Sequence, residues 1–414
     1  MKKSICSIIT VIICAFTLSP CKALCDASEY KFTSSFIQNW YCRDWTKERW
    51  IAEFNAAKDV GFESLILQST YDIVRGECSD EDNKKNPSAY PNTQSFCMFL
   101  SEKEATYHSG QNGGDALEIA LEAAKSTGMK LWLGTVNDDM WWNYGWGIPD
   151  SYFEEWSTTN AQLSASLITE MWQEYGEDYG NQIAGWYYTN EIWNIDVACN
   201  GTDNGEYVRI IGDNINASVS AINQVCPDKP LLISPFYNTD ISSPEQFAGF
   251  IGNIIDTAEI RTIDIYACQD GGGREYSADV IREWAIAQKK AIDGRMQFWI
   301  NNECFDKEYN PKSIDKLRES YYATADIVEN NIIFSWNHYY ASDANLNNDF
   351  SKFSCDMIIG DANNDGVFDV SDVVILQKWL LSIPDTKNIN YKNADLNNDG
   401  CLDVFDICLM REGL

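Results

Sequence analysis

The stretch Ile183-Ala-Gly-Trp-Tyr-Tyr-Thr-Asn190-Glu191 is a short apolar run that ends in an amide and a carboxylate. Similar runs recur along the chain, and each is nearly continuously apolar, which is typical of parallel strands that are covered on both faces. The strands predicted in this way are Lys31–Gln38, Ser64–Gln68, Lys130–Thr135, Ile183–Thr189, Leu231–Pro235, Thr262–Cys268, Gln297–Ile300 and Ile332–Trp336.

Amphipathic stretches of helical period lie between these runs. The predicted helices are Thr46–Val60, Asp115–Thr127, Phe153–Tyr175, Tyr207–Val225, Glu245–Ala258, Ala278–Ile292 and Ser313–Val328. Eight strands that alternate with helices over about 300 residues predict an α/β fold, a (β/α)8 TIM barrel. A doubly wound open sheet is the main alternative. It is disfavoured because Gly271-Gly272-Gly273 lacks the spacing of a dinucleotide fingerprint and is interpreted as a flexible loop.

The 414 residues divide into four predicted segments: a signal peptide (1–27), the barrel (28–342), a linker rich in Asn, Asp and Ser (343–357) and a small C-terminal module (358–414). Met1-Lys2-Lys3 followed by the apolar run Ile5–Leu18 has the form of a signal peptide, and it is too short to cross a bilayer. We therefore expect a secreted, extracellular protein without membrane insertion. Export permits disulfides, and Cys78 and Cys97 are the favoured pair among 14 cysteines.

Composition excludes several classes of function. The chain has 62 acidic and 31 basic side chains, a formal net charge of -31, so its surface repels nucleic acid. The chain has only two histidines, which argues against nucleophilic or metal chemistry that depends on histidine. Carboxylates are abundant, and 15 Trp and 21 Tyr supply flat apolar rings with a polar edge, which suit the faces of sugars.

A twelve-residue motif occurs twice in the C-terminal module. Oxygen ligands at places 1, 3, 5, 9 and 12, a backbone carbonyl at place 7 and glycine at place 6 suit a calcium ion. The predicted ligands are Asp361, Asn363, Asp365, Val367, Asp369 and Asp372 in the first copy, and Asp395, Asn397, Asp399, Cys401, Asp403 and Asp406 in the second. The module is therefore predicted to hold two calcium ions, and catalysis is expected to need no cofactor.

This duplicated loop and helix resembles a type I dockerin, the small all-α calcium-binding module that docks enzymes onto cohesin domains of cellulosome scaffolds. The resemblance implies a cohesin partner and places its recognition at loop places 10 and 11 and on the helix that follows. Those places hold Val370 and Ser371 in the first copy, and Val404 and Phe405 in the second. Because these residues differ between the two copies, the sequence argues against equally tight cohesin binding in two orientations of the module.

Two glutamates follow predicted strands of the barrel. Glu191 comes after the fourth strand in Trp186-Tyr-Tyr-Thr-Asn190-Glu191, and Glu303 comes after the seventh in Phe298-Trp-Ile-Asn-Asn302-Glu303. Active sites of such barrels lie at the carboxyl ends of the strands, and glycoside cleavage uses a pair of carboxyl groups. Each glutamate could instead cap a helix or pair with a lysine.

The arrangement is similar to a clan of retaining glycoside hydrolases with an acid/base after strand four and a nucleophile after strand seven. In that clan an asparagine precedes the acid/base, as Asn190 does, and a tryptophan ends strand eight, as Trp336 does. The barrel more closely resembles a bacterial glycoside-hydrolase-like family known as a domain of unknown function. The matching stretches include Ser35-Phe-Ile-Gln38, Leu65-Ile-Leu-Gln68, Ile233-Ser-Pro-Phe-Tyr237 and Ile263-Asp-Ile-Tyr-Ala-Cys-Gln269-Asp270. Gln269-Asp270 stands where the clan often has Tyr or His.

The other predicted substrate contacts lie at strand ends or on rim loops. Trp141-Trp142-Asn-Tyr144-Gly-Trp146 is expected to be an exposed aromatic cluster for sugar stacking, although it could be a local hydrophobic cap. The full set is Gln38, Gln68, Asn137, Trp141, Trp142, Asn190, Trp193, Tyr237, Gln269, Asp270 and Trp336.

Together these features predict a secreted cellulosomal glycoside hydrolase that cleaves plant cell-wall polysaccharide by a retaining mechanism. Glu191 would be the general acid/base and Glu303 the nucleophile. The alternatives are a non-catalytic carbohydrate-binding barrel and a structural component of the scaffold complex.

Overall fold

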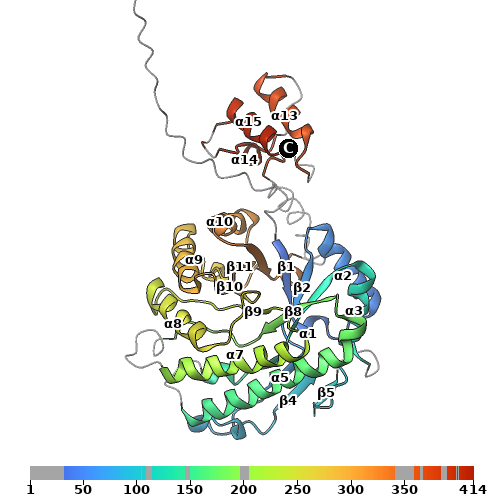
Figure 1. Ribbon diagram of the computed structural model, residues 1–414, viewed down its shortest axis with the longest axis vertical. Helices are drawn as coiled ribbons and strands as arrows, with labels where there is room; N and C mark the ends of the chain where they lie inside the picture. Colours follow the sequence, from blue (N-terminus) through green and yellow to red (C-terminus); the bar gives the residue numbers. More distant parts are fainter. Residues whose placement is uncertain are drawn as a thin grey trace, which may run out of the picture. The chain divides into compact units, whose positions relative to one another are not determined.

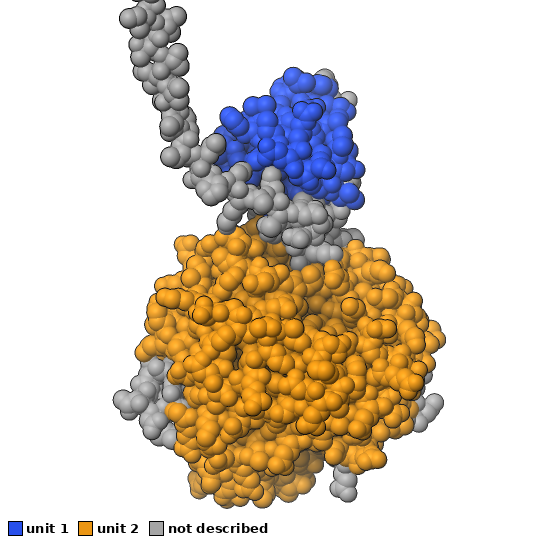
Figure 2. Space-filling view, in the orientation of Figure 1, with its two compact units in different colours: residues 1–30, 355–414 blue, residues 31–354 orange. Residues whose placement is uncertain are grey.

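The computed structural model describes residues 32–103, 105–108, 114–144, 150–195, 205–340, 359–363, 367–383, 389–397, 399 and 401–414. The predicted signal peptide and linker, together with Trp146 and Asp365, lie outside these residues. The described residues fall into two compact units, one within 31–354 and one within 355–414 (Figure 2). None of the helices in the described part of the chain has both the length and the apolar character of a membrane span.

The larger unit is a closed barrel of parallel strands, which confirms the predicted fold (Figure 1). All of its strand pairs are parallel, and the order around the ring is β1-β12-β11-β10-β9-β8-β6-β2. The strands are β1 (Phe32–Ile37), β2 (Ser64–Leu67), β6 (Lys130–Gly134), β8 (Ile183–Tyr188), β9 (Leu231–Ile233), β10 (Ile265–Gln269), β11 (Gln297–Glu303) and β12 (Asn330–Phe334).

Inward-pointing apolar side chains fill the barrel, with members from β1, β2, β6, β8, β9, β10 and β12. They form one cluster of Phe36, Ile66, Trp132, Tyr187, Leu232, Ile265, Ala267 and Ile332. A filled interior of this kind makes the barrel a packed core and leaves ligand binding to its two ends.

The long helices surround the barrel as predicted, and α5 and α7 lie side by side along it (Figure 1). They are α2 (Lys47–Asp59), α3 (Ala116–Thr127), α5 (Ser151–Tyr179), α7 (Gly205–Val225), α8 (Pro244–Thr257), α9 (Ala278–Ile292) and α10 (Ile314–Thr324). Most begin at a hydroxyl or carboxylate cap, such as Thr46, Asp115, Asp150 or Ser277, whose side chain accepts a backbone N–H of the first turn. Short helices α1 (Asn39–Cys42), α4 (Trp141–Tyr144) and α11 (Trp336–Tyr339) follow strands β1, β7 and β12.

A second sheet was missed by the sequence analysis. It has the order β5-β4-β3-β7 and consists of β3 (Tyr71–Val74), β4 (Gln94–Cys97), β5 (Tyr107–His108) and β7 (Val136–Asp138). The predicted disulfide between Cys78 and Cys97 is wrong, because both residues are free thiols. Cys97 is fully buried at the end of β4, whereas the Cys78 thiol donates to the carbonyl of Asp80 in the preceding loop.

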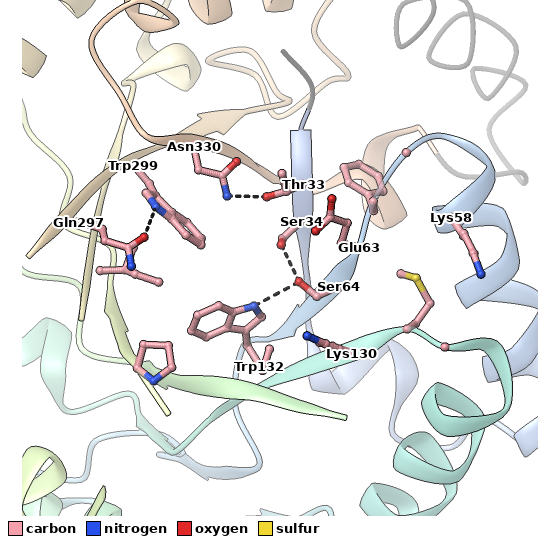
Figure 3. Close-up of a pocket in the computed structure, with 17 residues that line it drawn as sticks. Thr33, Ser34, Lys58, Glu63, Ser64, Lys130, Trp132, Gln297, Trp299 and Asn330 are labelled. Carbon is pink, nitrogen blue, oxygen red and sulfur yellow. Dashed lines mark hydrogen bonds between the residues drawn. The ribbon is translucent and has the colours of Figure 1, made fainter. Parts of the chain in front are cut away.

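A cavity of about 710 Å³ opens at the amino ends of the strands (Figure 3). Several of its polar side chains bond to one another: Trp132 donates to Ser64, Ser64 bonds to Ser34, and Trp299 donates to Gln297. These groups are therefore hydrogen-bonded within the protein.

The smaller unit contains helices α13 (Val370–Leu380), α14 (Tyr391–Ala394) and α15 (Val404–Glu412). They enclose a small core of Ala362, Val373, Leu376, Ala394, Leu402 and Met410. Both motif copies lead directly into a helix, since Asp369 and Asp403 are the N-caps of α13 and α15.

Candidate active site and calcium loops

The ends of β8 and β11 bring the two predicted catalytic glutamates to one cavity. β11 runs to Glu303 itself, three residues further than predicted, and Glu191 lies three residues beyond the end of β8. Both side chains line a cavity of about 420 Å³. The other described residues that line it are Phe236, Gln269, Gly273, Arg274, Phe305, Asp306, Lys307, Tyr309 and Phe334.

The environment of Glu191 favours its protonated form. Burial and the negative charge of Glu303 together raise the pKa of Glu191 to about 7, although a hydrogen bond with Gln269 acts in the opposite direction. A carboxylic acid that keeps its proton near neutral pH can donate it to a leaving oxygen. Gln269 is held in place because its Nε2 donates to the carbonyl of Ser234 at 3.1 Å.

The groups around Glu303 include some that raise its pKa and some that lower it. Burial and the neighbouring Asp270 raise the pKa of Glu303 to about 7, but three groups favour its charged form: the N–H of Gly273, Lys312 and Arg274. The Gly273 N–H donates to Oε2 of Glu303 at 2.5 Å. Because two carboxylates that share a cavity repel each other, the pair holds its first proton tightly near neutral pH.

Asp270 supports the Glu303 backbone and does not line the cavity, contrary to its predicted role as a substrate contact. The side chain is 1% exposed. Its Oδ1 accepts from the N–H groups of Gly272 (2.8 Å) and Glu303 (3.1 Å), and its Oδ2 accepts from Asn302 Nδ2 (2.9 Å). Asp270 therefore fixes both the glycine loop and the end of β11.

The glycine triplet has a definite structural role. A Cβ on Gly273 would lie 2.4 Å from the Phe305 ring and 3.0 Å from Glu303 Oε2. Only glycine allows the backbone N–H to approach the carboxylate this closely. The triplet interpreted from sequence as a flexible loop is thus the hydrogen-bond donor of the Glu303 side chain.

The aromatic wall of the cavity differs from the predicted one. Phe236, Phe305, Tyr309 and Phe334 supply it. Trp193, buried at 3% exposure, stacks on Phe236 at 5.5 Å with the rings nearly parallel. Trp193 is therefore one layer behind the cavity wall.

Two of the predicted tryptophans occupy other places. Trp141 is 3% exposed and packs against Trp156, so it belongs to a hydrophobic cap and not to a binding surface. Its neighbour Trp142 is 43% exposed with its ring 6.3 Å from that of Phe236, next to the cavity wall. The exposed cluster was therefore predicted correctly for Trp142 and wrongly for Trp141.

The prediction for Trp336 is also wrong. β12 ends at Phe334, two residues earlier than predicted, and Trp336 is turned into the core against Phe62. Phe334, whose ring packs at 5.5 Å from Phe36, takes the predicted place in the cavity wall.

Three of the remaining predicted polar contacts bond within the protein. Asn190 donates to Asn160 and Tyr188, and Asn137 donates to Asp72. Tyr237 donates to the carbonyl of Asp270 and stacks on Trp284. None of these three is among the described residues that line the cavity, and neither is Gln38 or Gln68. Of the predicted substrate contacts, Gln269 alone lines it.

Arg274, Phe305, Lys307 and Tyr309 were not predicted. They come from the glycine loop after β10 and from the turn after β11, both of which the sequence pattern marks only as loops. Two sequence signals were available. Phe305 follows Glu303 by two residues, and Arg274 directly follows three glycines.

Comparisons with known proteins identify two domains in the chain. The model of a domain of unknown function (DUF4434) matches residues 32–346. The chain belongs to this family. The Dockerin type I domain model matches residues 359–414, so the chain also carries a type I dockerin, a calcium-binding module that implies a cohesin partner. No curated protein sequence matches the chain.

Among solved structures, one similar chain is a candidate alpha-L-fucosidase from Bacteroides thetaiotaomicron, with a TM-score of 0.58, 19% identity, and coverage of 82% of this chain and 98% of that one. An intracellular xylanase from Thermoanaerobacterium saccharolyticum has a TM-score of 0.41, 12% identity, and coverage of 78% and 92%. The endoglucanase catalytic domain from Thermobifida fusca has a TM-score of 0.41, 12% identity, and coverage of 76% and 80%. At 19% identity, the similarity to the first of these structures shows a shared barrel fold.

The described parts of the two dockerin loops share one arrangement. Asp372 accepts from the N–H groups of Asn363 and Asp369, and Asp406 accepts in the same way from Leu396 and Asp403. Asp361, Asp372 and Asp406 are fully buried. Buried carboxylates surrounded by loop backbone fit a calcium ion, which prefers oxygen ligands. Across the described residues no three Asp, Glu, His or Cys side chains converge on one point, and Asp365 lies outside them.

Proposed function

We propose that the protein is a secreted glycoside hydrolase that cleaves a plant cell-wall polysaccharide with retention of configuration. The observation that carries the proposal is the pair of glutamates at the ends of β8 and β11, which line one cavity and both have a raised pKa. Retaining cleavage needs two such carboxyl groups, one as acid/base and one as nucleophile.

The surroundings of the pair support different roles for its members. Glu303 receives the Gly273 N–H and lies near Lys312 and Arg274, all of which favour a carboxylate. Burial and the negative charge of Glu303 both disfavour ionisation of Glu191, which suits a general acid. We assign Glu303 as the nucleophile and Glu191 as the general acid/base.

Substrate binding is assigned to the residues around the pair. Phe236, Phe305 and Tyr309 offer ring faces to a sugar, and Trp142 extends this surface beyond the cavity. Gln269, which bonds to Glu191, is the candidate for a contact to a sugar hydroxyl. An aromatic surface with a few polar groups is typical of carbohydrate sites.

The dockerin would attach this barrel to a cohesin of a scaffold protein. Val370 and Val404, at loop place 10 of each copy, are 66% and 59% exposed, and Phe405 is 65% exposed. Large apolar side chains left in water on a small domain mark a protein-binding surface. We assign both predicted sets of six calcium ligands to two ions, with Val367 and Cys401 contributing their backbone carbonyls.

The decisive experiment is covalent trapping. The wild-type protein is first tested for reducing-sugar release on cellulose, xylan, mannan and pectin. A 2-deoxy-2-fluoro glycosyl fluoride of the sugar that is released slows the second step and should leave one sugar on the peptide that contains Glu303. Mass spectrometry locates the label, and Glu303→Gln is the control that should remain unlabelled.

Two outcomes would contradict the proposal. A label on another residue refutes the assignment of Glu303. If wild type binds these polysaccharides in pull-down assays and hydrolyses none of them, the non-catalytic carbohydrate-binding barrel is the better interpretation.

A further inference from the structure

Cations are scarce on this protein, and almost all of its arginines are paired. Among the described arginines of the barrel, every one except Arg274 has a carboxylate within 4 Å. The paired residues are Arg43, Arg49, Arg75, Arg209, Arg261, Arg282, Arg295 and Arg318. The exception lies in the candidate active site.

Arg274 lines the cavity from the glycine loop. It ends the short 3-10 helix Gly272–Arg274, and its N–H donates to the carbonyl of Gly271 at 3.0 Å. The side chain is exposed, lines the cavity beside Glu191 and Glu303, and lies close enough to Glu303 to favour the charged form of that carboxyl. A guanidinium without a carboxylate partner at a cavity mouth is available to a ligand.

A second cation, Lys307, lines the same cavity. Its ammonium is 3.5 Å from Glu275 and 3.8 Å from Glu308, so its charge is partly offset at the rim. The one additional acid in the wall, Asp306, is already engaged, because its Oδ1 accepts the N–H groups of Glu308 and Asn310 at 3.0 and 2.9 Å. Asp306 therefore closes its own turn, and no ion pair joins it to Arg274 among the described residues.

Arg274 and Lys307 thus bring two cations to the cavity of a strongly acidic molecule. A protein with a formal net charge of -31 repels anionic ligands at long range. A neutral sugar needs no cation, whereas a sugar carboxylate can form two parallel charge-assisted hydrogen bonds with a guanidinium. We propose that the cavity binds an acidic glycan, with Arg274 contacting the carboxylate of a uronic acid residue and Lys307 adding to the attraction.

This substrate class rests on the proposed glycosidase site, but binding can be measured without turnover. Two pairs of probes differ only in the carboxylate: a glucuronic-acid-substituted xylotriose and trigalacturonic acid, each compared with its carboxyl-reduced form. Calorimetry with Glu303→Gln should show that the acidic member of at least one pair binds about 10-fold more tightly or better, because a charge-assisted hydrogen bond is lost in the reduced form. The preference should shrink as salt is raised.

The matched variants are Arg274→Gln and Arg282→Gln, each made in the Glu303→Gln background. Arg282 is also exposed, but it pairs with Asp326 and lies outside the cavity lining. Arg274→Gln should remove the preference for the acidic probe and leave the affinity for the neutral probe within about 2-fold, the usual effect of an exposed substitution. Arg282→Gln should leave both affinities unchanged.

Three results would overturn the inference: equal binding of the acidic and reduced forms in both pairs, no binding of either pair, or a preference that survives Arg274→Gln. If Arg274 serves only Glu303, Arg274→Gln in the otherwise wild-type enzyme slows acidic and neutral substrates equally and shifts the pH profile. A clear preference for the acidic probe without any hydrolysis by wild type would support the inference and refute the proposed catalytic function.

Discussion

The barrel and the dockerin both bury carboxylates, but they stabilise them in different ways. In the barrel, burial raises the pKa of both Glu191 and Glu303 to about 7, and the charges of Glu303 and Asp270 respectively add to the shift. In the dockerin, Asp372 and Asp406 each accept backbone N–H groups on both oxygens. The same functional group thus lies in a shared cavity in one unit and is held by loop backbone in the other.

Local structure explains the difference. The two glutamates stand at or beyond strand ends, where few N–H donors are free, and their longer side chains reach a shared cavity. The aspartates stand at the third position of helices α13 and α15, where a capping box supplies donors. Donor-rich surroundings keep a carboxylate charged, whereas donor-poor surroundings allow it to bind and release protons.

The largest expected effect is the loss of turnover when the proposed nucleophile is replaced. Glu303→Gln keeps the shape of the side chain and its place beside Gly273 but cannot form a glycosyl ester. Hydrolysis should fall by about 10⁴-fold or more, as for other variants that lack a nucleophile. Steady-state kinetics measures it, and an unchanged melting temperature serves as the control for folding. Residual activity within 10-fold of wild type would contradict the assignment.

Calcium removal should unfold the dockerin and leave the barrel intact. Residues 358–414 carry ten acidic and four basic side chains around a small core, so repulsion is severe without metal. EDTA should abolish the helical signal of α13 and α15 and cohesin binding, while calorimetry should show two ions bound by wild type and one by Asp361→Ala or Asp395→Ala. A melting transition of the barrel that moves with calcium would contradict this separation.

Removal of the acid/base should matter only for substrates that need a proton. Glu191→Ala should slow polysaccharide hydrolysis by about 10²- to 10⁴-fold, the usual contribution of general acid catalysis. Aryl glycosides with good leaving groups should still glycosylate Glu303 and then accumulate the intermediate, visible as a burst in stopped-flow measurements. Equal losses on both substrates would indicate a structural role for Glu191.

The raised pKa values also predict a pH-dependent stability. A carboxyl with a folded pKa of about 7, above its unfolded value, stabilises the fold at low pH, and this contribution is lost as pH rises toward and past 7. Glu191→Gln should therefore raise the melting temperature by a few degrees at pH 8 and much less at pH 4. Glu275→Gln is the control, since the pKa of Glu275 is lowered by Lys316 at the surface. Equal changes at both pH values would contradict the prediction.

The smallest effect is expected at the two adjacent tryptophans. Trp142→Ala should raise KM several-fold for long oligosaccharides and little for disaccharides, because one exposed stacking ring is lost and kcat is not touched. Trp141→Ala should instead lower the melting temperature, since it leaves a cavity in the buried cap. Reversed outcomes for the two variants would show that the exposed ring is not a subsite.

The comparison also shows how far the sequence was informative. Strands and both motif copies were predictable because they rest on local patterns: apolar runs for the strands and fixed oxygen spacing for the loops. The predicted position of Glu303 needed only the end of one strand. The sheet formed by β3, β4, β5 and β7 was missed because its strands are two to four residues long and lie in polar surroundings.

Side-chain direction was the other quantity that the sequence could not provide. Trp141 and Trp142 are adjacent in the chain but face the interior and the solvent, respectively. Asp270 and Arg274 come from one loop, yet the first holds the backbone of Glu303 and the second faces the cavity. Such assignments depend on contacts between distant segments, which a local pattern does not contain.

The reactivity of buried thiols in the barrel would report local opening of the structure. Cys304 follows Glu303 directly, is fully buried, and has a pKa that burial raises well above the ordinary value, so it is unreactive while the strand end stays closed. Its rate of labelling by a thiol reagent would report how often the end of β11 opens. Labelling of Cys268, which is also buried on β10, would report the opening of the neighbouring strand. The pair could show whether a bound glycan holds this rim of the barrel shut.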